Sequence, residues 1–597
     1  MSRIPSSTST DTARKAGFHA RIVGLWIACS AVLLAIAGPM AWYHLFPDAD
    51  DSLRMVQVRD LVNGQSWFDF HQYRINPPDG VLMHWSRLVD LPLAATIMLL
   101  RPLLGEAAAD MLTALLVPLV LLLGCLLLVG RLGRRMVDPG TGLFAVILCF
   151  LIPPAMLQLA PLRVDHHGWQ ILLSLLALSA MFAPKSWSGG ATAGTALAAS
   201  LSISLETLPL AAVFGATCAL RLVRGEQGWL GGYAAGLGAS SLALFLATRG
   251  LGDLASHCDS ISPGYLAALT SCATGGLLAE GVLRYGGKAG RPLAIGVLGL
   301  AGGGAVLALW LVAPACLRGG AFAELDPIVR TMWYERVLEG LPFWRHTLGN
   351  AALLVLFPLV GLSLALRAAY ADWRAGGAWQ RWFDYALLLG GATVTGMLVA
   401  RASATAGLFA AVPVAWQVHR LFLQYRAEQD ARRRVPMLLV MAAFAFPALP
   451  FLIVSPLVSA KTSTAVKVCR YWDFLPAFDA MAPGVVFAPL DLGPPLLEGT
   501  HHAVVATGHH RGNAAMRDVI SAFTGTDDSA RRLLAQHRAD WLMICPRGNE
   551  ETIYRRHAPD GFIAHLAKGQ APDWLEPVSI APQSGVKVWR IKRAEQP

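Results

Sequence analysis

Long apolar stretches recur along the whole chain and constrain its fold more than any other feature. A helix crosses a bilayer with about 17–25 apolar residues, and the sequence contains about thirteen such stretches. Hydrophobic residues make up 55% of the 597 residues and charged residues only 15%, which predicts a polytopic α-helical membrane protein. The predicted spans are 22–45, 107–130, 142–160, 168–183, 189–204, 207–224, 228–247, 262–283, 292–316, 346–367, 382–400, 404–421 and 437–457.

The distribution of Arg and Lys among the loops predicts the orientation. Basic residues concentrate in alternate loops, as they do on the cytoplasmic side of membrane proteins, and the N-terminal segment 1–21 belongs to this basic set. The net charge of +10 is explained by these loops and requires no nucleic-acid partner. A helical stretch at 90–104 would break the alternation, so we interpret it as interfacial or re-entrant. The simple layout, without obvious eukaryotic sorting signals, predicts a bacterial inner membrane.

Three regions are predicted along the chain: a cytoplasmic segment 1–21, a transmembrane domain 22–457 with outer loops 46–106 and 317–345, and a periplasmic domain 458–597. After Leu457 the charge rises and the apolar runs shorten. Strand-like and helix-like segments alternate there, which predicts an α/β domain with a two-layer or three-layer sheet. Cys469 and Cys545 lie in this domain as a disulfide pair or as reduced thiols. The strand-like segments are 484–492, 502–508, 539–546 and 586–591, and the helix-like segments are 514–523 and 528–537.

The first outer loop is unusually rich in ionisable residues for a segment beside lipid, where an unpaired charge costs on the order of a few kcal/mol. Asp48, Asp50 and Asp51 cluster at the outer end of the first span. A solvated helix cap followed by an ordinary loop would account for them. Arginine, histidine and tryptophan recur further on, however, and such side chains suit sugar rings and phosphates. The candidate substrate-binding residues of this loop are Arg54, Arg74, His84, Trp85 and Arg87.

A second ionisable group, Asp165, His166 and His167, separates two predicted spans. Asp165 and His167 are close enough to share one divalent ion, with a first-loop carboxylate, Asp50, completing the ligands. Mixed carboxylate and imidazole ligands suit Mn²⁺ somewhat better than Mg²⁺, which prefers oxygen. His166 is a candidate substrate contact. The alternative is a structural role for outward-facing histidines.

A third ionisable region is the outer segment 318–345, which carries charged and aromatic residues. Long loops of this composition often act as lids, although an amphipathic helix on the surface would have the same composition. Arg401 stands alone at the outer end of a predicted span. It is a candidate phosphate contact, or an interfacial arginine that snorkels to water.

Together these features resemble the GT-C membrane glycosyltransferases, and most of all the catalytic subunits of archaeal and bacterial oligosaccharyltransferases. The Asp-His-His at 165–167 is similar to the motif of the archaeal members, which implies that Asp165 and His167 bind a divalent metal. The resemblance also implies that one first-loop aspartate serves both metal and acceptor. The spacing to Arg54 favours Asp48 for this role, whereas a tandem acidic pair favours Asp50 and Asp51.

Two further elements extend the resemblance, and one departs from it. VLEGLPFW at 337–344 is similar to the family's Ser/Thr-x-x-Glu element, with Glu339 as its glutamate and Arg336 at the hydroxyl position, and Arg401 lies where the family places a phosphate-binding arginine. The acceptor motif Trp-Trp-Asp is missing: PLDLG at 489–493 retains Asp491 without either tryptophan. A protein, lipid or glycan acceptor therefore remains open. A histidine-rich turn nearby either contributes to an altered acceptor-binding site or has no role. Its residues are His501, His502, His509, His510 and Arg511.

The resemblance implies that the protein transfers a sugar or glycan from a polyprenyl-phosphate-linked or pyrophosphate-linked donor to an acceptor on the periplasmic face. The donor would enter from the membrane lipid, and the reaction would be metal-assisted and inverting. The alternatives are a transporter or flippase, and a polymerase or ligase of lipid-linked saccharides. Transporters place charges near the bilayer midplane and often contain inverted repeats, whereas these charges gather at the outer ends of the spans.

Overall fold

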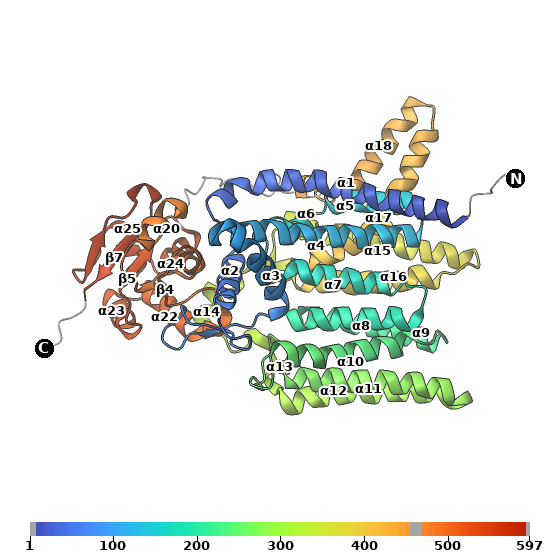
Figure 1. The fold of residues 1–597 in the computed structure, drawn as a ribbon, viewed down its shortest axis with the longest axis horizontal. Coiled ribbons are helices and arrows are strands. Elements are labelled where there is room, and N and C mark those ends of the chain that lie inside the picture. Colours follow the sequence, from blue (N-terminus) through green and yellow to red (C-terminus); the bar gives the residue numbers. More distant parts are fainter. Residues whose placement is uncertain (1–6, 450, 454–468, 593–597) are drawn as a thin grey trace.

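The computed structural model describes residues 7–449, 451–453 and 469–592. Figure 1 shows an elongated molecule, in which a bundle of long helices lies beside a smaller domain of helices and strands at one end. Helices α2 (Ala49–Val62) and α3 (Arg87–Leu104) lie at the end of the bundle that faces this domain. The arrangement confirms the predicted fold class, a helical membrane domain with a C-terminal α/β domain.

Eight helices of the described chain are long and apolar enough to cross a membrane. The predicted span 142–160 is a bent pair, α5 (Pro139–Cys149) and α6 (Pro153–Leu159), which meet at 72° and count as a ninth. Pro153 and Pro154 cause the bend, because proline cannot continue the hydrogen-bonding of a preceding helix. The eight are α1 (Ser7–Trp42), α4 (Glu106–Met136), α9 (Leu208–Val223), α10 (Trp229–Thr248), α11 (Pro263–Tyr285), α12 (Gly290–Val312), α15 (Leu348–Arg374) and α17 (Ser403–Ala427).

The predicted number of about thirteen spans is not confirmed. Three predicted spans are helices that are shorter or less apolar than the eight: α7 (His167–Ala180), α8 (Ser186–Ile203) and α16 (Gln380–Leu398). At the predicted last span, 437–457, helix α18 (Ala431–Ala445) ends before Pro447, and part of that span lies outside the described residues. Helix α3, predicted as interfacial or re-entrant, is not among the candidate spans.

Helices α8 and α10 pack closely through glycine. A Cβ atom on Gly194 of α8 would lie 2.2 Å from the carbonyl oxygen of Tyr233, and one on Gly236 of α10 would lie 2.3 Å from that of Ala191. Glycines four residues apart, at 190 and 194 and at 232 and 236, therefore let the two backbones touch, as small residues do between membrane helices.

The C-terminal domain contains a five-stranded sheet in the order β4-β3-β5-β7-β6. Strands β3 (Val485–Phe487), β4 (Ala503–Val504) and β5 (Trp541–Ile544) are parallel, and β7 (Lys587–Ile591) and β6 (Leu575–Val578) extend the sheet antiparallel. The predicted strands and helices are confirmed, and β6, which contains Glu576 and Pro577, was not predicted. The helices of the C-terminal domain are α20 (Tyr471–Asp479), α21 (Gly493–Gly499), α22 (Asn513–Thr524), α23 (Asp527–Gln536), α24 (Asn549–His557) and α25 (Phe562–Lys568).

Both faces of the sheet are covered, and the first outer loop covers part of one. Side chains alternate along β5, so that Leu542 packs with α22 to α25 and Met543 packs with α20 and α21. The second core also contains Leu53 of α2 and Trp85 from the first outer loop. Within that loop the short strands β1 (His71–Gln72) and β2 (Val81–Leu82) form a hairpin, and Ile75 makes a parallel bridge with Val504 of β4.

The outer segment 317–345 also packs on the C-terminal domain. It folds into α13 (Pro314–Arg318), α14 (Pro327–Met332) and short 3₁₀ turns, and Val329 and Met332 join the core beneath α22. The described chain also contains two disulfides. Cys469–Cys545 is the pair that the sequence left open between disulfide and thiols, and Cys258–Cys316, which was not predicted, joins the loop before α11 to α13.

Candidate active site

The first turn of α2 directs three aspartates in different directions. Asp48 is the N-cap, with φ of −139°, and its carboxylate accepts a hydrogen bond from the amide of Asp50 at 3.0 Å. Asp51 is fully buried and accepts hydrogen bonds from Arg163 Nη1 at 2.8 Å and from the amide of Asp165 at 2.9 Å. Asp51 therefore fastens the 163–165 turn to α2, and Asp48 and Asp50 remain beside open space.

Asp165 is a buried carboxylate with one engaged oxygen. Its Oδ1 lies 2.6 Å from His166 Nδ1 and accepts a hydrogen bond from Arg54 Nη2 at 3.2 Å. Burial opposes ionisation most strongly, but His166, His167 and Arg54 together hold the pKa of Asp165 well below its usual range. The other oxygen, Oδ2, is buried without a hydrogen bond and lies 3.2 Å from His167 Nε2.

The orientation of His167 explains why that contact is not a hydrogen bond. His167 Nδ1 donates to Gln170 Oε1 at 3.3 Å, and Gln170 in turn donates to Thr207 Oγ1 at 3.1 Å. With its proton on Nδ1, the ring presents the lone pair of Nε2 to Asp165 Oδ2. Two lone pairs face each other favourably when a cation lies between them, and a polar side chain behind the ligating histidine is typical of metal sites. These residues therefore fit a divalent metal.

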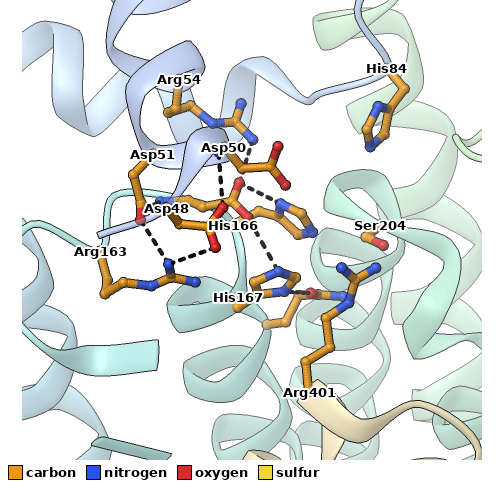
Figure 2. Close-up of polar contacts among 12 residues, drawn as sticks. Asp48, Asp50, Asp51, Arg54, His84, Arg163, His166, His167, Ser204 and Arg401 are labelled. Carbon is orange, nitrogen blue, oxygen red and sulfur yellow. Dashed lines mark hydrogen bonds and ion pairs between the residues drawn. The ribbon is translucent and has the colours of Figure 1, made fainter. Parts of the chain in front are cut away.

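Asp50 supplies a second carboxyl group, and so a third candidate ligand, near Asp165 and His167 (Figure 2). Within the described chain its carboxyl group has no hydrogen-bond or ion-pair partner. Burial, followed by the charges of Asp165, Asp48 and Glu339, raises the pKa of Asp50 well above its usual range, against a smaller opposing effect of Arg401. The protein alone thus does not stabilise the ionised form of Asp50. This is the behaviour expected of a carboxyl group whose charge is stabilised by a bound ligand.

Arg54 and Arg87, predicted as substrate-binding residues, are buried behind the site. Both are fully buried and share Asp90, which lies 2.9 Å from Arg54 Nη1 and 3.0 Å from Arg87 Nη1. The guanidinium carbon of Arg54 lies 4.2 Å from the ring centre of the buried Trp85. A buried arginine needs carboxylate partners. Arg54 has Asp90 and Asp165 as partners, so it holds the Asp165 side chain in place.

Arg401 joins two carboxylates, one of which the sequence analysis missed. Arg401 Nη1 lies 2.8 Å from Glu339, and Arg401 Nε donates to Glu206 at 3.0 Å. The amide of Ala400 donates to the carbonyl of Leu341 at 3.1 Å, which fixes the 338–341 segment beside Arg401. Glu206 had a signal in the sequence, since it is the only charged residue between the predicted spans 189–204 and 207–224.

Two cavities meet at this site. The first, of about 590 Å³, lies between α2, the 333–339 segment and the C-terminal domain, and Asp48, Asp50 and Glu339 line it with Trp333 and Tyr471. The second, of about 450 Å³, shares Asp48 and Glu339 and extends along α6 and α15. Its wall combines basic with apolar side chains, namely Arg163, Arg401, His346, Leu157, Leu353 and Leu354. The carboxylates therefore stand between an acidic, aromatic cavity and a basic, apolar one.

Of the remaining predicted residues, Arg74 and His84 lie away from the site, and Asp491 lines its first cavity. The guanidinium of Arg74 donates to the carbonyls of Leu497 at 2.9 Å and His502 at 2.7 Å, and also to that of Thr500, so it docks the first outer loop on the C-terminal domain. His84 contacts His509 beyond Trp85. Asp491 is exposed and lines the first cavity, and its amide donates to Glu550 at 2.7 Å.

The fold and the site define a class: a multi-pass membrane protein with the GT-C fold, as predicted, in which carboxyl and imidazole groups gather where the bundle meets the α/β domain. Neither protein-family models nor curated proteins match the sequence. Among solved structures, the chain is similar to the archaeal oligosaccharyltransferase AglB from Archaeoglobus fulgidus, in complex with an inhibitory peptide and a dolichol-phosphate. The identity is 14%, the match covers 92% of this chain and 71% of that one, and the TM-score is 0.63.

Two other structures of an Archaeoglobus fulgidus oligosaccharyltransferase are similar as well. One is a complex with Zn and sulfate, with 14% identity, coverage of 86% of this chain and 66% of that chain, and a TM-score of 0.60. The other is tethered to an acceptor peptide with an NVT sequon, with 15% identity, coverage of 91% and 70%, and a TM-score of 0.62. At these identities the likeness establishes the fold.

Proposed function

We propose that the protein is a glycosyltransferase that moves a sugar or glycan from a polyprenyl-phosphate-linked or pyrophosphate-linked donor to an acceptor. One observation carries the proposal: two chemically different cavities share Asp48 and Glu339, and Asp50, which lines the first cavity, lies near Asp165 and His167. A lipid-linked donor and a polar acceptor need such neighbouring sites, because the reacting carbon must be reached from both sides.

The cavity of about 450 Å³ suits the donor. Leu157, Leu353 and Leu354 offer an apolar path for a lipid chain, and Arg163 and Arg401 can attract its phosphate. Both arginines are held by carboxylates, so the donor phosphate would share them with Asp51 and Glu339. An AglB structure that contains a dolichol-phosphate has the same fold, which supports a donor of this class.

Asp165, His167 and Asp50 would hold the divalent metal, Mn²⁺ or Mg²⁺. When bound, such an ion stabilises the negative charge that develops on a leaving phosphate. The chain's own residues prepare the ligands: Gln170 fixes the tautomer of His167, and Arg54 and Asp51 fix the side chain and the backbone of Asp165. An oligosaccharyltransferase with this fold has been solved in complex with Zn and sulfate, which supports a divalent metal in a protein of this fold.

On the acceptor side, Asp50 is the first-loop aspartate that we assign to the nucleophile. Asp51 is buried against Arg163, and Asp48 caps α2, whereas the Asp50 carboxyl group lines the acceptor cavity and has no partner among the described residues. A carboxylate there would orient or deprotonate the incoming group for one inverting displacement. Glu339 and Asp491 line the same cavity and would bind the acceptor, which is a protein, lipid or glycan.

We further propose that the site faces the periplasm of a bacterial inner membrane, with residues 1–21 in the cytoplasm and 458–597 outside. Both disulfides lie in segments that the charge distribution assigns to the outer side. Disulfides persist in oxidising compartments and are rare in the cytosol, which supports this orientation.

A transfer assay tests the function. Purified protein would be incubated with radiolabelled undecaprenyl-phosphate sugars, Mn²⁺ and membrane acceptors, and wild type compared with Asp165→Asn and His167→Gln. We expect roughly 100-fold or greater loss of transfer in both variants. Asp528→Asn and His557→Gln, exposed in the C-terminal domain, serve as matched controls and should retain activity. Substrate movement across vesicles without transfer would support the transporter alternative and refute this proposal.

A further inference from the structure

Three histidines from distant parts of the sequence meet outside the candidate active site. His84 follows β2 in the first outer loop, and His509 and His510 lie between β4 and α22. One ring nitrogen from each lies within 4.8 Å of the other two, and His84 Nδ1 lies 2.8 Å from His509 Nε2. The three imidazoles therefore converge closely enough to bind one ion.

A carboxylate stands behind one of these rings. Asp259, in the loop between α10 and α11, lies 2.7 Å from His510 Nε2, which leaves Nδ1 of that ring as its ligand atom. Arg511 also donates to Asp259, from Nε at 2.7 Å and Nη2 at 2.6 Å. Metal-binding histidines usually donate their second ring N–H to a carboxylate or carbonyl, which fixes the tautomer and the ring orientation. Asp259 has this position relative to His510.

The second histidine has an unsatisfied nitrogen. His509 is 4% exposed, and its Nδ1 is buried without a hydrogen-bond partner within the described structure. A buried polar atom left without a partner costs about 1–3 kcal/mol. A hydrogen bond between His84 Nδ1 and His509 Nε2 does not satisfy this nitrogen, whereas an ion held through His509 Nδ1 would.

The donor atoms select the kind of ion. All three candidate ligands are imidazole nitrogens, and the nearby carboxylate of Asp259 is engaged by His510 and Arg511. Mg²⁺ and Ca²⁺ prefer oxygen ligands, whereas Zn²⁺ is commonly bound by histidine nitrogen with three protein ligands and an open fourth position. His510 and Asp259 also line a cavity of about 300 Å³, which can admit an ion and supply water as a fourth ligand.

We propose that His84, His509 and His510 form a second metal site, for Zn²⁺ or an ion of similar preference. Bound metal would tie the first outer loop to the C-terminal domain, with Asp259 positioning His510 from the bundle. This inference does not depend on the proposed glycosyl transfer, because its ligands are separate from Asp50, Asp165 and His167.

Zinc stoichiometry of the full-length protein in detergent tests the proposal. The chain would be stripped with a chelator, dialysed against Zn²⁺ and analysed by atomic emission in an Asp165→Asn/His167→Gln background, which disables the first site. We expect this background to retain one bound Zn²⁺, and the addition of His510→Ala to remove it. His501→Ala, an exposed histidine paired with Asp479 in the same domain, is the matched control and should retain the ion. Asp259→Asn should weaken affinity by roughly 10–100-fold.

A spectroscopic measurement keeps the test decisive if the His510 variant does not fold. Co²⁺ bound by three histidines and water in a tetrahedral site absorbs strongly in the visible range, whereas octahedral Co²⁺ absorbs weakly. Visible bands in the Asp165→Asn/His167→Gln protein would support the site. A background that binds no Zn²⁺ and shows no bands, or a His510→Ala protein with unchanged zinc content, would show that the histidines form only a hydrogen-bonded pair.

Discussion

Neighbouring aspartates in α2 have opposite environments, and this contrast separates a structural residue from a reactive one. Asp51 is surrounded by donors, from Arg163 and from the amide of Asp165. Asp50 has none within the described chain, and the contrast lies in these donors, because burial raises the pKa of both carboxyl groups. The same residue type, one position apart, therefore stabilises the turn in one case and depends on a ligand in the other.

This contrast predicts different effects of removing each charge. Asp51→Asn leaves Arg163 without its closest partner, and losing one member of a buried pair costs about 3–5 kcal/mol, so we expect a clearly lower thermal midpoint in detergent. Because the surroundings of Asp50 disfavour its charge, Asp50→Asn should leave the midpoint unchanged or higher, while transfer activity falls roughly 100-fold or more. Equal losses of stability in the two variants would contradict the assignment.

Glu551 in α24 predicts a pH dependence of the C-terminal domain. Burial raises the pKa of Glu551 to about 7 in the folded chain, although its carboxyl group accepts a hydrogen bond from the amide of Cys545. Because the folded pKa lies above the unfolded value, the free energy of unfolding is highest below the unfolded value and falls as pH rises through about 7. The loss should be on the order of 3 kcal/mol.

Chemical unfolding of the full-length protein, followed by tryptophan fluorescence at about pH 5 and about pH 8, measures this effect. Glu551→Gln keeps the hydrogen-bond acceptor and removes the titration, so its stability should change less between the two pH values than that of wild type. Glu576→Gln, exposed on β6, is the control and should behave like wild type. A Glu551 variant with the wild-type pH dependence would refute the prediction.

At the residue scale, the sequence indicated where ionisable residues gather but not which way their side chains face. Asp165 and His167 lie 3.2 Å apart and Asp50 lies near them, so a metal site shared by the three stays a prediction. Arg54 and Arg87 carry the same charge as Arg163, yet they are buried behind the site, and nothing in a loop sequence reports that orientation. The contact between His84 and His509 spans 425 positions, beyond what local spacing can indicate.

At the scale of single elements, apolar composition located the helices, and proline and glycine set their details. Windows of hydropathy predicted one span at 142–160, and Pro153 and Pro154 divide it into α5 and α6. The same hydropathy windows predicted α8 and α10. They did not indicate how closely the two helices pack, because the contact depends on which glycines face the partner helix.

The α8–α10 contact predicts a strong effect of a single methyl group. At Gly194 the added Cβ would approach the backbone of Tyr233 and Leu237 within 2.2 and 2.7 Å, so the helices must separate. We expect Gly194→Ala to lower stability by about 1–3 kcal/mol, as overpacking does, measured by thermal unfolding in detergent. Gly296→Ala on α12, where nothing lies within 4 Å of the new atom, should be neutral or slightly stabilising. Equal behaviour of the two variants would contradict close packing.

At the scale of the whole molecule, the membrane domain and the C-terminal domain could be predicted, but the way in which they pack against each other could not. Composition separates them near Leu457. Their shared core, in which Leu53 of α2 packs with strand residues of the sheet, joins segments that look independent in sequence. The acidic cavity is formed by both domains, so its shape depends on this packing.

The bridge between Ile75 and Val504 also has a consequence for biosynthesis. Arg74 and the carbonyl of His502, which it binds, are separated by 428 residues, and ribosomes add about 5–20 residues per second. Roughly 20–90 s therefore pass between the synthesis of the first outer loop and that of its partner strand. During this interval the amide of Asn76 and the carbonyl of Arg74 lack Val504, their partner in the finished protein. Unpaired edges of this kind attract other chains, so a nascent chain must be protected until its last quarter emerges.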